Sequence, residues 1–196
     1  MDQTPIPFTF NAKNTLESVG RRTVHIRKST NDTKRVTCAM TVSASGLVLT
    51  PFLVFKGAPN GRIEKTEFAT CPPGMIYTCQ SNAWMDERVM NMWIEKVLKL
   101  YVQKVPMGVA PVLMLDSLHR CHMVKPIVKN TIENLGFEVQ HIPGGCTSLY
   151  QPVDIGVNNS FNSRMRRLWE EWMISTGLNE TGKITPPTRK DIAEWS

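Results

Sequence analysis

The sequence predicts an α/β protein, and three patterns along the chain lead to this prediction. Residues 35–43 alternate between apolar and polar side chains, which is the period-two pattern of a strand with one buried face. Residues 84–101 repeat apolar side chains at helical spacing. Residues 112–115 form an unbroken apolar run, which is typical of a strand covered on both faces in the middle of an α/β sheet.

The composition fits an intracellular globular protein. The chain has 196 residues and is 41% hydrophobic, which suits one domain with or without a tail. The first residues lack the layout of a signal peptide, and no apolar run approaches the roughly 18 residues of a membrane-spanning helix. The five cysteines form no CxxC pair, so we expect neither a disulfide framework nor a structural zinc site. No membrane partner is expected.

A β-hairpin is predicted from residue 35 onward. The strand at residues 35–43 is followed by a turn at residues 45–46 and a return strand over residues 47–55. Residues 56–73 are rich in glycine, proline and charge, so we expect a loop there. A short strand at residues 75–79 follows.

The next element is an amphipathic helix over residues 84–101. Asp86 and Glu87 suit its first turn, because negative side chains are stabilised at the positive end of the helix dipole. Its tryptophan and methionine stripe is interpreted as core and not as a cofactor site. Three helix breakers follow, at Pro106, Gly108 and Pro111.

A strand-helix-strand unit comes next. The apolar run 112–115 ends on Asp116, residues 124–135 predict a helix closed by Gly136, and residues 137–142 predict a short strand. A carboxylate at the carboxyl end of a strand lies where open α/β sheets bind ligands. Aspartate also begins turns and caps helices, so the position alone leaves both readings open.

The last predicted helix begins beyond Pro152. Residues 143–151 contain two glycines and are predicted to be a loop, and Asp154 lies at or just inside the start of the helix. We expect residues 1–177 to form one core domain. Residues 178–196 have little apolar content and are predicted to be a polar tail or linker.

The positive charge is concentrated near the amino terminus. The net charge is +6, and residues 11–35 hold seven basic residues against two acids. Such a cluster favours a phosphate backbone through counterion release, although a solvated surface without a partner is the alternative. The basic residues are Lys13, Arg21, Arg22, Arg27, Lys28, Lys34 and Arg35.

Three acids occupy comparable places at the ends of predicted elements. Asp2 is at the beginning of the chain, Asp116 ends a strand and Asp154 begins a helix. The strand-helix-strand unit fills the gap of 37 residues between the second and third acids. Because this unit returns the chain to the same sheet edge, Asp116 and Asp154 can lie in one cleft.

Three motifs around these acids resemble a known family. They are residues 1–5, Leu115-Asp116-Ser117 with His122, and residues 147–154, which read TSLYQPVD. With them, residues 1–176 resemble the catalytic core of a DDE-superfamily endonuclease of the pogo branch of Tc1/mariner transposases. That group includes jerky-like and centromere-protein-B-like derived proteins. The resemblance implies an RNase H-like mixed sheet flanked by helices, here with a truncated amino-terminal strand.

The resemblance also implies a site and its partners. Asp2, Asp116 and Asp154 would be the catalytic metal ligands for cleavage and strand transfer of DNA, and His122 and Gln151 could support these ligands by hydrogen bonding near them. Hard cations such as Mg²⁺ or Mn²⁺ prefer carboxylate oxygens, which fits this set. A nuclear location and DNA as partner are expected, and a homodimer is left open. The expected DNA contacts are Arg21, Arg22, Arg27, Lys28, Arg164 and Arg167.

Two rival functions remain open. The pogo-like pattern usually has lysine shortly after the third acid, whereas this chain has asparagine at Asn158, Asn159 and Asn162. A catalytically silent, nucleic-acid-binding relic of a transposase is therefore the alternative, and a nuclease acting on RNA-containing duplexes is a third. Because only Met1 precedes Asp2, the first carboxylate is expected to be loosely held and the chain as given to be a poor enzyme.

Overall fold

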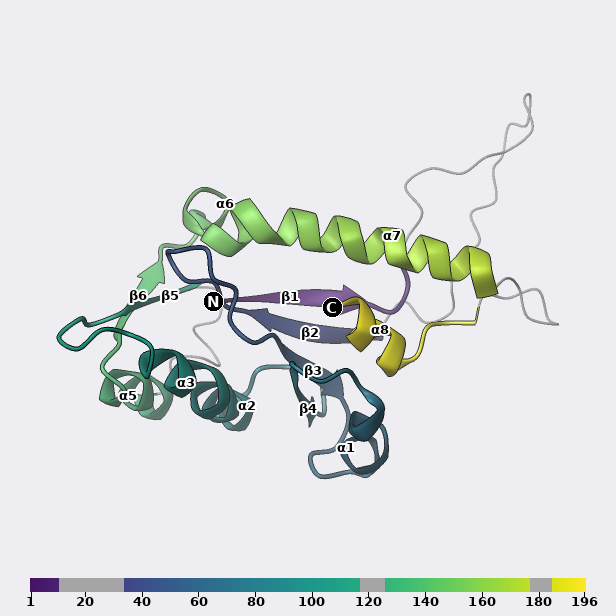
Figure 1. Cartoon of the computed structure of the whole chain (residues 1–196), viewed down its shortest axis with the longest axis horizontal. Helices are drawn as coiled ribbons and strands as arrows, with labels where there is room; N and C mark the ends of the chain where they lie inside the picture. The colour runs from purple at the N-terminus through teal and green to yellow at the C-terminus, as the bar shows by residue number, and fades with distance from the viewer. Residues whose placement is uncertain (11–33, 117–125, 177–184) are drawn as a thin grey trace.

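The computed structural model describes residues 1–10, 34–116, 126–176 and 185–196. Within them, β-strands form a central layer with helices on both faces (Figure 1). The strands are β1 (Asp2–Pro7), β2 (Arg35–Met40), β3 (Phe52–Lys56), β4 (Ile76–Gln80), β5 (Val112–Asp116) and β6 (Glu138–Ile142). The helical segments are α1 (Arg62–Thr66), η1 (Phe68–Thr70), α2 (Glu87–Trp93), η2 (Ile94–Leu98), α3 (Lys99–Val102), α5 (Pro126–Asn134), α6 (Thr147–Tyr150), η4 (Asp154–Asn158), α7 (Asn159–Thr176) and α8 (Arg189–Trp195).

The strands form two sheets that meet at the start of β1. One sheet has the order β1-β2-β3-β4, and β5 pairs with β6 in the other. The β1/β2 and β2/β3 pairs are antiparallel, whereas β3/β4 and β5/β6 are parallel. The amino group of Met1 donates a hydrogen bond to the carbonyl of Met114, 3.0 Å away. The beginning of β1 therefore lies beside the middle of β5.

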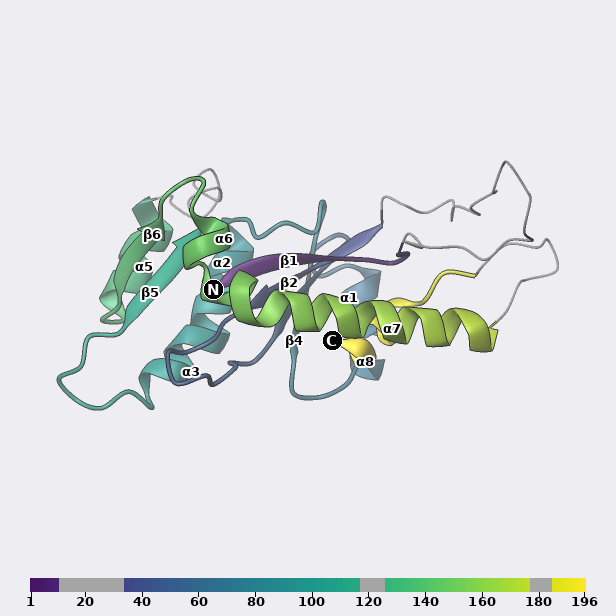
Figure 2. The same ribbon diagram turned by 90° about the horizontal axis from the view of Figure 1, so that it is seen from above.

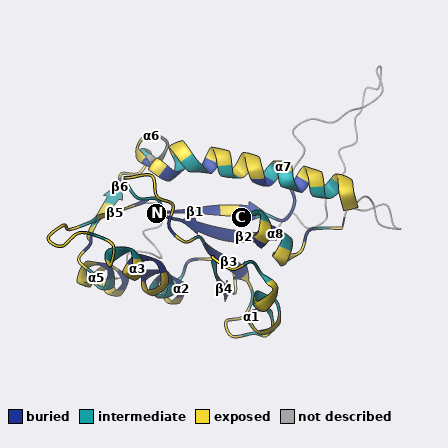
Figure 3. Cartoon of the chain, in the orientation of Figure 1, coloured by how far each residue is buried: buried dark blue, intermediate teal, exposed yellow. Residues whose placement is uncertain are grey.

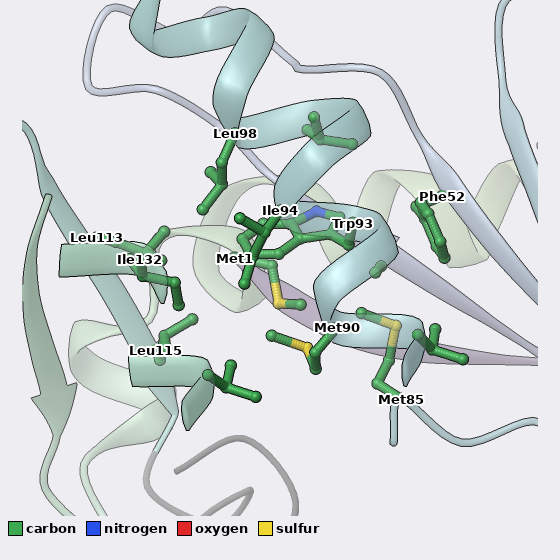
Figure 4. Packing of buried hydrophobic residues seen from close by; sticks show 14 of the residues in the cluster. Met1, Phe52, Met85, Met90, Trp93, Ile94, Leu98, Leu113, Leu115 and Ile132 are labelled. Atoms are coloured by element: carbon green, nitrogen blue, oxygen red, sulfur yellow. The ribbon is translucent and has the colours of Figure 1, made fainter. Parts of the chain in front are cut away.

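Two hydrophobic cores lie on opposite faces of the strands. In β3, Phe52 and Val54 pack into a core with Trp93 of α2, while Leu53 and Phe55 pack into the other core. This alternation follows from the period-two geometry of a strand. Figure 4 shows the first core, which joins β5 and α5 to α2 around Trp93, its largest fully buried side chain.

Helix α7 covers the second core. Figures 1 and 2 show this helix running lengthwise along the sheet from a start near the amino end of β1. Its side chains Met165 and Trp169 are buried, while its outer face is exposed (Figure 3). The predicted long amphipathic helix beyond Pro152, with Asp154 at its start, is confirmed by η4 and α7.

Most predicted elements are confirmed. The hairpin is formed by β2 and β3, the short strand by β4, and the strand-helix-strand unit by β5, α5 and β6. Asp86 caps α2, because its carboxylate accepts a hydrogen bond from the Val89 amide at 2.9 Å.

Two predicted loops are wrong in part. Residues 56–73 contain the short helices α1 and η1, and residues 143–151 contain the single turn α6. Tertiary contacts explain the first of these, because Glu64 of α1 accepts a hydrogen bond from the Cys79 amide of β4 at 2.7 Å. Glycine, proline and charge in the sequence indicate a break in the longer elements but do not reveal such a contact.

The prediction that β5 is covered on both faces is also wrong. Val112 is 54% exposed and Met114 is 41% exposed, whereas Leu113 and Leu115 are buried. The strand therefore has one buried face. An apolar run gives no information about which of its side chains another layer will cover, so the sequence could not distinguish these two cases.

The carboxyl-terminal segment is not only a polar tail. Thr188 caps α8 through a capping box with Asp191, and Ile192 and Ala193 are fully buried against the second core. Arg189 also forms an ion pair with Glu67, 2.9 Å away. Few apolar residues are needed to dock one short helix, which is why the low apolar content predicted a linker.

We predict that α8 stabilises the fold. Ile192→Ala should lower the free energy of unfolding by about 2–4 kcal/mol, because it leaves a cavity in a core. Glu194→Ala, on the exposed side of the same helix, should change it by less than about 0.5 kcal/mol. Urea denaturation measures both. Equal, small effects would mean that α8 contributes little to the core.

Candidate metal centre

Each of the three acids stands next to a buried apolar residue. Met1 precedes Asp2 and is 8% exposed, Leu115 precedes Asp116, and Val153 precedes Asp154. These neighbours pack into the cores, so they fix the backbone from which each acid projects. Asp2 and Asp116 are themselves buried, and Asp154 is partly exposed.

Asn158 connects two of the acids directly. Its Nδ2 donates one hydrogen bond to Asp2 Oδ2 at 2.9 Å and another to Asp154 Oδ1. Its Oδ1 accepts a hydrogen bond from the Thr4 hydroxyl at 2.6 Å. The beginning of β1 and the π-helical turn η4 are thus joined side chain to side chain, across more than 150 positions in the sequence.

The π-helical turn contributes to this geometry. Asp154 and Asn158 are the first and last residues of η4, and their side chains meet across the turn. Single π-helical turns within longer helices occur frequently at functional sites. Thr4 and Asp2 are two residues apart on β1, so their side chains project from the same face of the strand. One amide can therefore contact side chains from both elements.

The three acids interact electrostatically. Burial raises the pKa of the Asp154 carboxyl above its ordinary value. The hydrogen bond from Asn158 lowers that pKa in part, and the negative charges of Asp2 and Asp116 raise it. The structure therefore joins Asp2 and Asp154 through Asn158 and places Asp116 within electrostatic reach of Asp154, although the sequence separates the three acids widely.

The chemistry of these side chains fits a hard divalent cation. The carboxylates of Asp2 and Asp116 raise the pKa of Asp154. A positive charge among these groups would relieve the repulsion, and Mg²⁺ and Mn²⁺ prefer such oxygen ligands. The thiols fit less well, because burial raises the pKa of Cys38 to about 12 and that of Cys79 to about 11. In the described part of the chain, no three Asp, Glu, His or Cys side chains are already grouped closely enough to hold a metal.

Gln151 and His122 are the two residues predicted to support the acids. Gln151 is 1% exposed, and neither its Oε1 nor its Nε2 has a hydrogen-bond partner among the described residues. A buried amide without partners is unusual and is consistent with a role near a site. His122 lies outside the described residues.

The predicted basic contacts lie away from the acids. Arg164 and Arg167 are exposed on α7, ten and thirteen residues after Asp154, which corresponds to about 15–20 Å along a helix. Arg167 also forms a solvent-exposed pair with Glu171 at 3.6 Å. The predicted contacts Arg21, Arg22, Arg27 and Lys28 lie outside the described residues.

Sequence reasoning missed two residues of the site. The sequence predicts neither as a site residue, because Asn158 stands where the family pattern has lysine and Thr4 is only part of the first motif. A signal for both was present in their spacing, because Asn158 is four residues after Asp154 on a helix and Thr4 is two residues after Asp2 on a strand. Their meeting could not be derived from either spacing alone.

Comparisons with known proteins identify the family of the chain. The family model described as DDE superfamily endonuclease matches residues 33–195, and the chain belongs to this family. "Pogo transposable element with KRAB domain" from Mus musculus and the protein of the same name from Homo sapiens are each 28% identical to the chain over 198 residues. The predicted pogo-like, transposase-derived character and the RNase H-like fold class are therefore confirmed.

The alignments cover nearly all of this chain but only part of each relative. The alignment covers 99% of this chain but 31% of each relative, so the chain spans about a third of the curated relatives' length. No solved structure matches the chain. Among the described helices, none is long and apolar enough to cross a membrane.

The raised pKa of Asp154 predicts a pH dependence of stability. A raised folded-state pKa means that ionising Asp154 destabilises the fold. This destabilisation grows as the pH rises from the ordinary aspartate pKa of ~4 through the raised value. Asp154→Asn should therefore raise the melting temperature of the metal-free protein at neutral pH by roughly 1–3 °C, since partial exposure screens the charge.

The control for this prediction is another loss of one negative charge. Glu95→Gln removes an exposed carboxylate that pairs with Lys99 and should leave the melting temperature unchanged or slightly lower. The gain from Asp154→Asn should shrink as the pH approaches ~4. A lower melting temperature for Asp154→Asn at neutral pH would contradict the interpretation. Thermal unfolding followed by circular dichroism in chelator measures all of these.

Proposed function

We propose that this chain is the catalytic core of a DNA endonuclease of the transposase type, dependent on Mg²⁺ or Mn²⁺. The observation that carries the proposal is that Asn158 joins the carboxylates of Asp2 and Asp154 by hydrogen bonds, with Asp116 near enough to raise the pKa of Asp154. Perturbed pKa values of interacting acids are enriched at catalytic sites. Membership in the DDE endonuclease family supports the same reading.

The three aspartates would hold the metal through their carboxylate oxygens. Metal ions bound there would stabilise the charge that develops on the attacking and leaving oxygens of a phosphodiester. The residues of this chain contribute the positions of the ligands. The buried neighbours of the acids fix their backbone, and Asn158 with Thr4 fixes the side chains of Asp2 and Asp154.

DNA would be held by basic residues beyond the acids. Arg164 and Arg167 are exposed on α7 and lie along the helix that begins at the site. At about 15–20 Å from the helix start, they could contact a duplex over roughly five base pairs from the cleavage point. The basic segment 11–35 is the other proposed contact. A DNA substrate implies a nuclear location, and a homodimer remains a prediction.

A catalytically silent DNA-binding protein is the second candidate. One observation favours it, namely that the amide of Asn158 lies between Asp2 and Asp154 and donates to both. A site whose carboxylates are already satisfied by an amide can be stable without a metal. The two candidates differ in nicking activity and agree in DNA binding, so both properties need to be measured.

We predict that cleavage depends on Asp116. Asp116→Asn should lower Mg²⁺-dependent nicking of supercoiled DNA by at least about 100-fold, because the substitution keeps the shape but removes a ligand charge. Glu95→Gln removes an exposed charge and should nick as the unmodified chain does. Gel assays of plasmid relaxation measure this. Equal nicking by Asp116→Asn would refute the site, and DNA binding without nicking by the unmodified chain would favour the silent protein.

We also predict that DNA binding is electrostatic. Arg164→Ala combined with Arg167→Ala should reduce the slope of log affinity against log salt by about 2, since each phosphate contact contributes ~0.9. Lys99→Ala with Lys129→Ala, on helices of the opposite face, should leave the slope unchanged. Fluorescence anisotropy with unrelated duplexes measures this, and an effect confined to one sequence would count against it. A sequence-independent loss is also expected on neutralising Arg21, Arg22, Arg27 and Lys28.

A further inference from the structure

Asn158 occupies a distinctive place between two acids. Its side chain is almost fully buried, at 9% exposure for the residue, and every polar atom of the amide has a partner. Both acceptors of its Nδ2 are carboxylates of the candidate metal centre, namely Asp2 and Asp154. Both donor protons of the amide are therefore used on acids of the proposed site.

The amide group is oriented by its surroundings. The hydroxyl of Thr4 donates to Oδ1 at 2.6 Å, and this hydrogen bond turns the opposite end of the amide, Nδ2, toward the acids. The amide nitrogen carries two N–H donors, and each carboxylate accepts one of them. The positive end of the amide dipole therefore faces two negative groups at once.

This arrangement reduces the repulsion between the acids. Asp2 and Asp154 each accept one hydrogen bond from the Asn158 amide, so two negative groups face the same partly positive NH₂ group. A cation held by the two carboxylates would offset the same negative charges. The amide and such a cation would therefore compete for the same two carboxylates.

We propose that Asn158 is a positioning residue that takes the place of the cation in the metal-free protein. It holds Asp2 and Asp154 together until a divalent metal ion displaces its Nδ2. The inference rests on the proposed function, because it takes these two acids to be metal ligands. It adds a specific residue that sets both the stability of the empty site and its affinity for the ion.

A thermodynamic cycle gives the sign of the effect. Removing the amide takes two charge-assisted hydrogen bonds from the metal-free protein. The metal-bound protein loses less, because the ion has already displaced those bonds. Since the two states are linked, the stability lost by the metal-free protein reappears as tighter metal binding.

The experiment compares Asn158→Ala with the unmodified chain, using Mg²⁺ alone as the probe. In chelator, the melting temperature of the variant should fall by several degrees. Saturating Mg²⁺ should raise it by more than it raises that of the unmodified chain. Calorimetric titration should give a dissociation constant for Mg²⁺ about tenfold lower, which corresponds to one charge-assisted hydrogen bond.

Two further variants sharpen the test. Thr4→Val removes the hydroxyl that orients the amide and should shift both quantities in the same direction by a smaller amount. Asn162→Ala removes an exposed asparagine one turn further along α7 and should change neither. If Asn158→Ala fails to fold even with Mg²⁺, the Thr4→Val result decides.

Each remaining outcome has a separate meaning. An equal fall in melting temperature with and without Mg²⁺ would show a structural role only, and weaker Mg²⁺ binding by Asn158→Ala would show that Asn158 is itself a ligand. Either result overturns the inference and leaves the proposed metal centre intact. If Mg²⁺ neither binds nor stabilises any of the chains, the metal centre fails and the inference fails with it.

Discussion

The candidate site depends on the concentration of negative charge at one end of the sheets. Asp2 and Asp116 are buried, Asp154 is partly buried, and the charges of the first two raise the pKa of the third. Buried carboxylates are destabilising unless a positive charge or hydrogen-bond donors compensate them. Here the amide of Asn158 provides such compensation for two of the three. A divalent cation would compensate the same negative charge.

The rest of the fold supplies the rigidity that this arrangement needs. Two apolar cores lie on the two faces of the strands, and buried residues next to each acid belong to one core or the other. The beginning of β1 is held between β2 and β5 by strand pairing and by the hydrogen bond from Met1 to Met114. Asp2 is therefore held more firmly than a position at the beginning of the chain suggests. A site of repelling acids requires such support, because repulsion alone would separate them.

Family membership and site geometry answer different questions. The DDE endonuclease match and the pogo relatives account for the fold. The position of Asn158 between Asp2 and Asp154 comes from the structure, in which its amide donates to both carboxylates. The hydrogen bonds of Asn158 join the first strand to the beginning of the long helix that covers the sheet, and they involve two of the proposed metal ligands.

The sequence by itself determined the order and type of the main elements and the identity of the three acids. Alternation in residues 35–43 and helical spacing after Pro152 are local properties, because backbone geometry alone sets those periods. Only the tertiary structure decided which surfaces are covered. It showed that β5 is buried on one face, where the sequence predicted two, and that the segment predicted to be a linker contains the packed helix α8. It also brought Thr4 and Asn158 together with Asp2 and Asp154. Contacts between side chains more than 150 positions apart depend on how the layers pack, and no local pattern in the sequence specifies that packing.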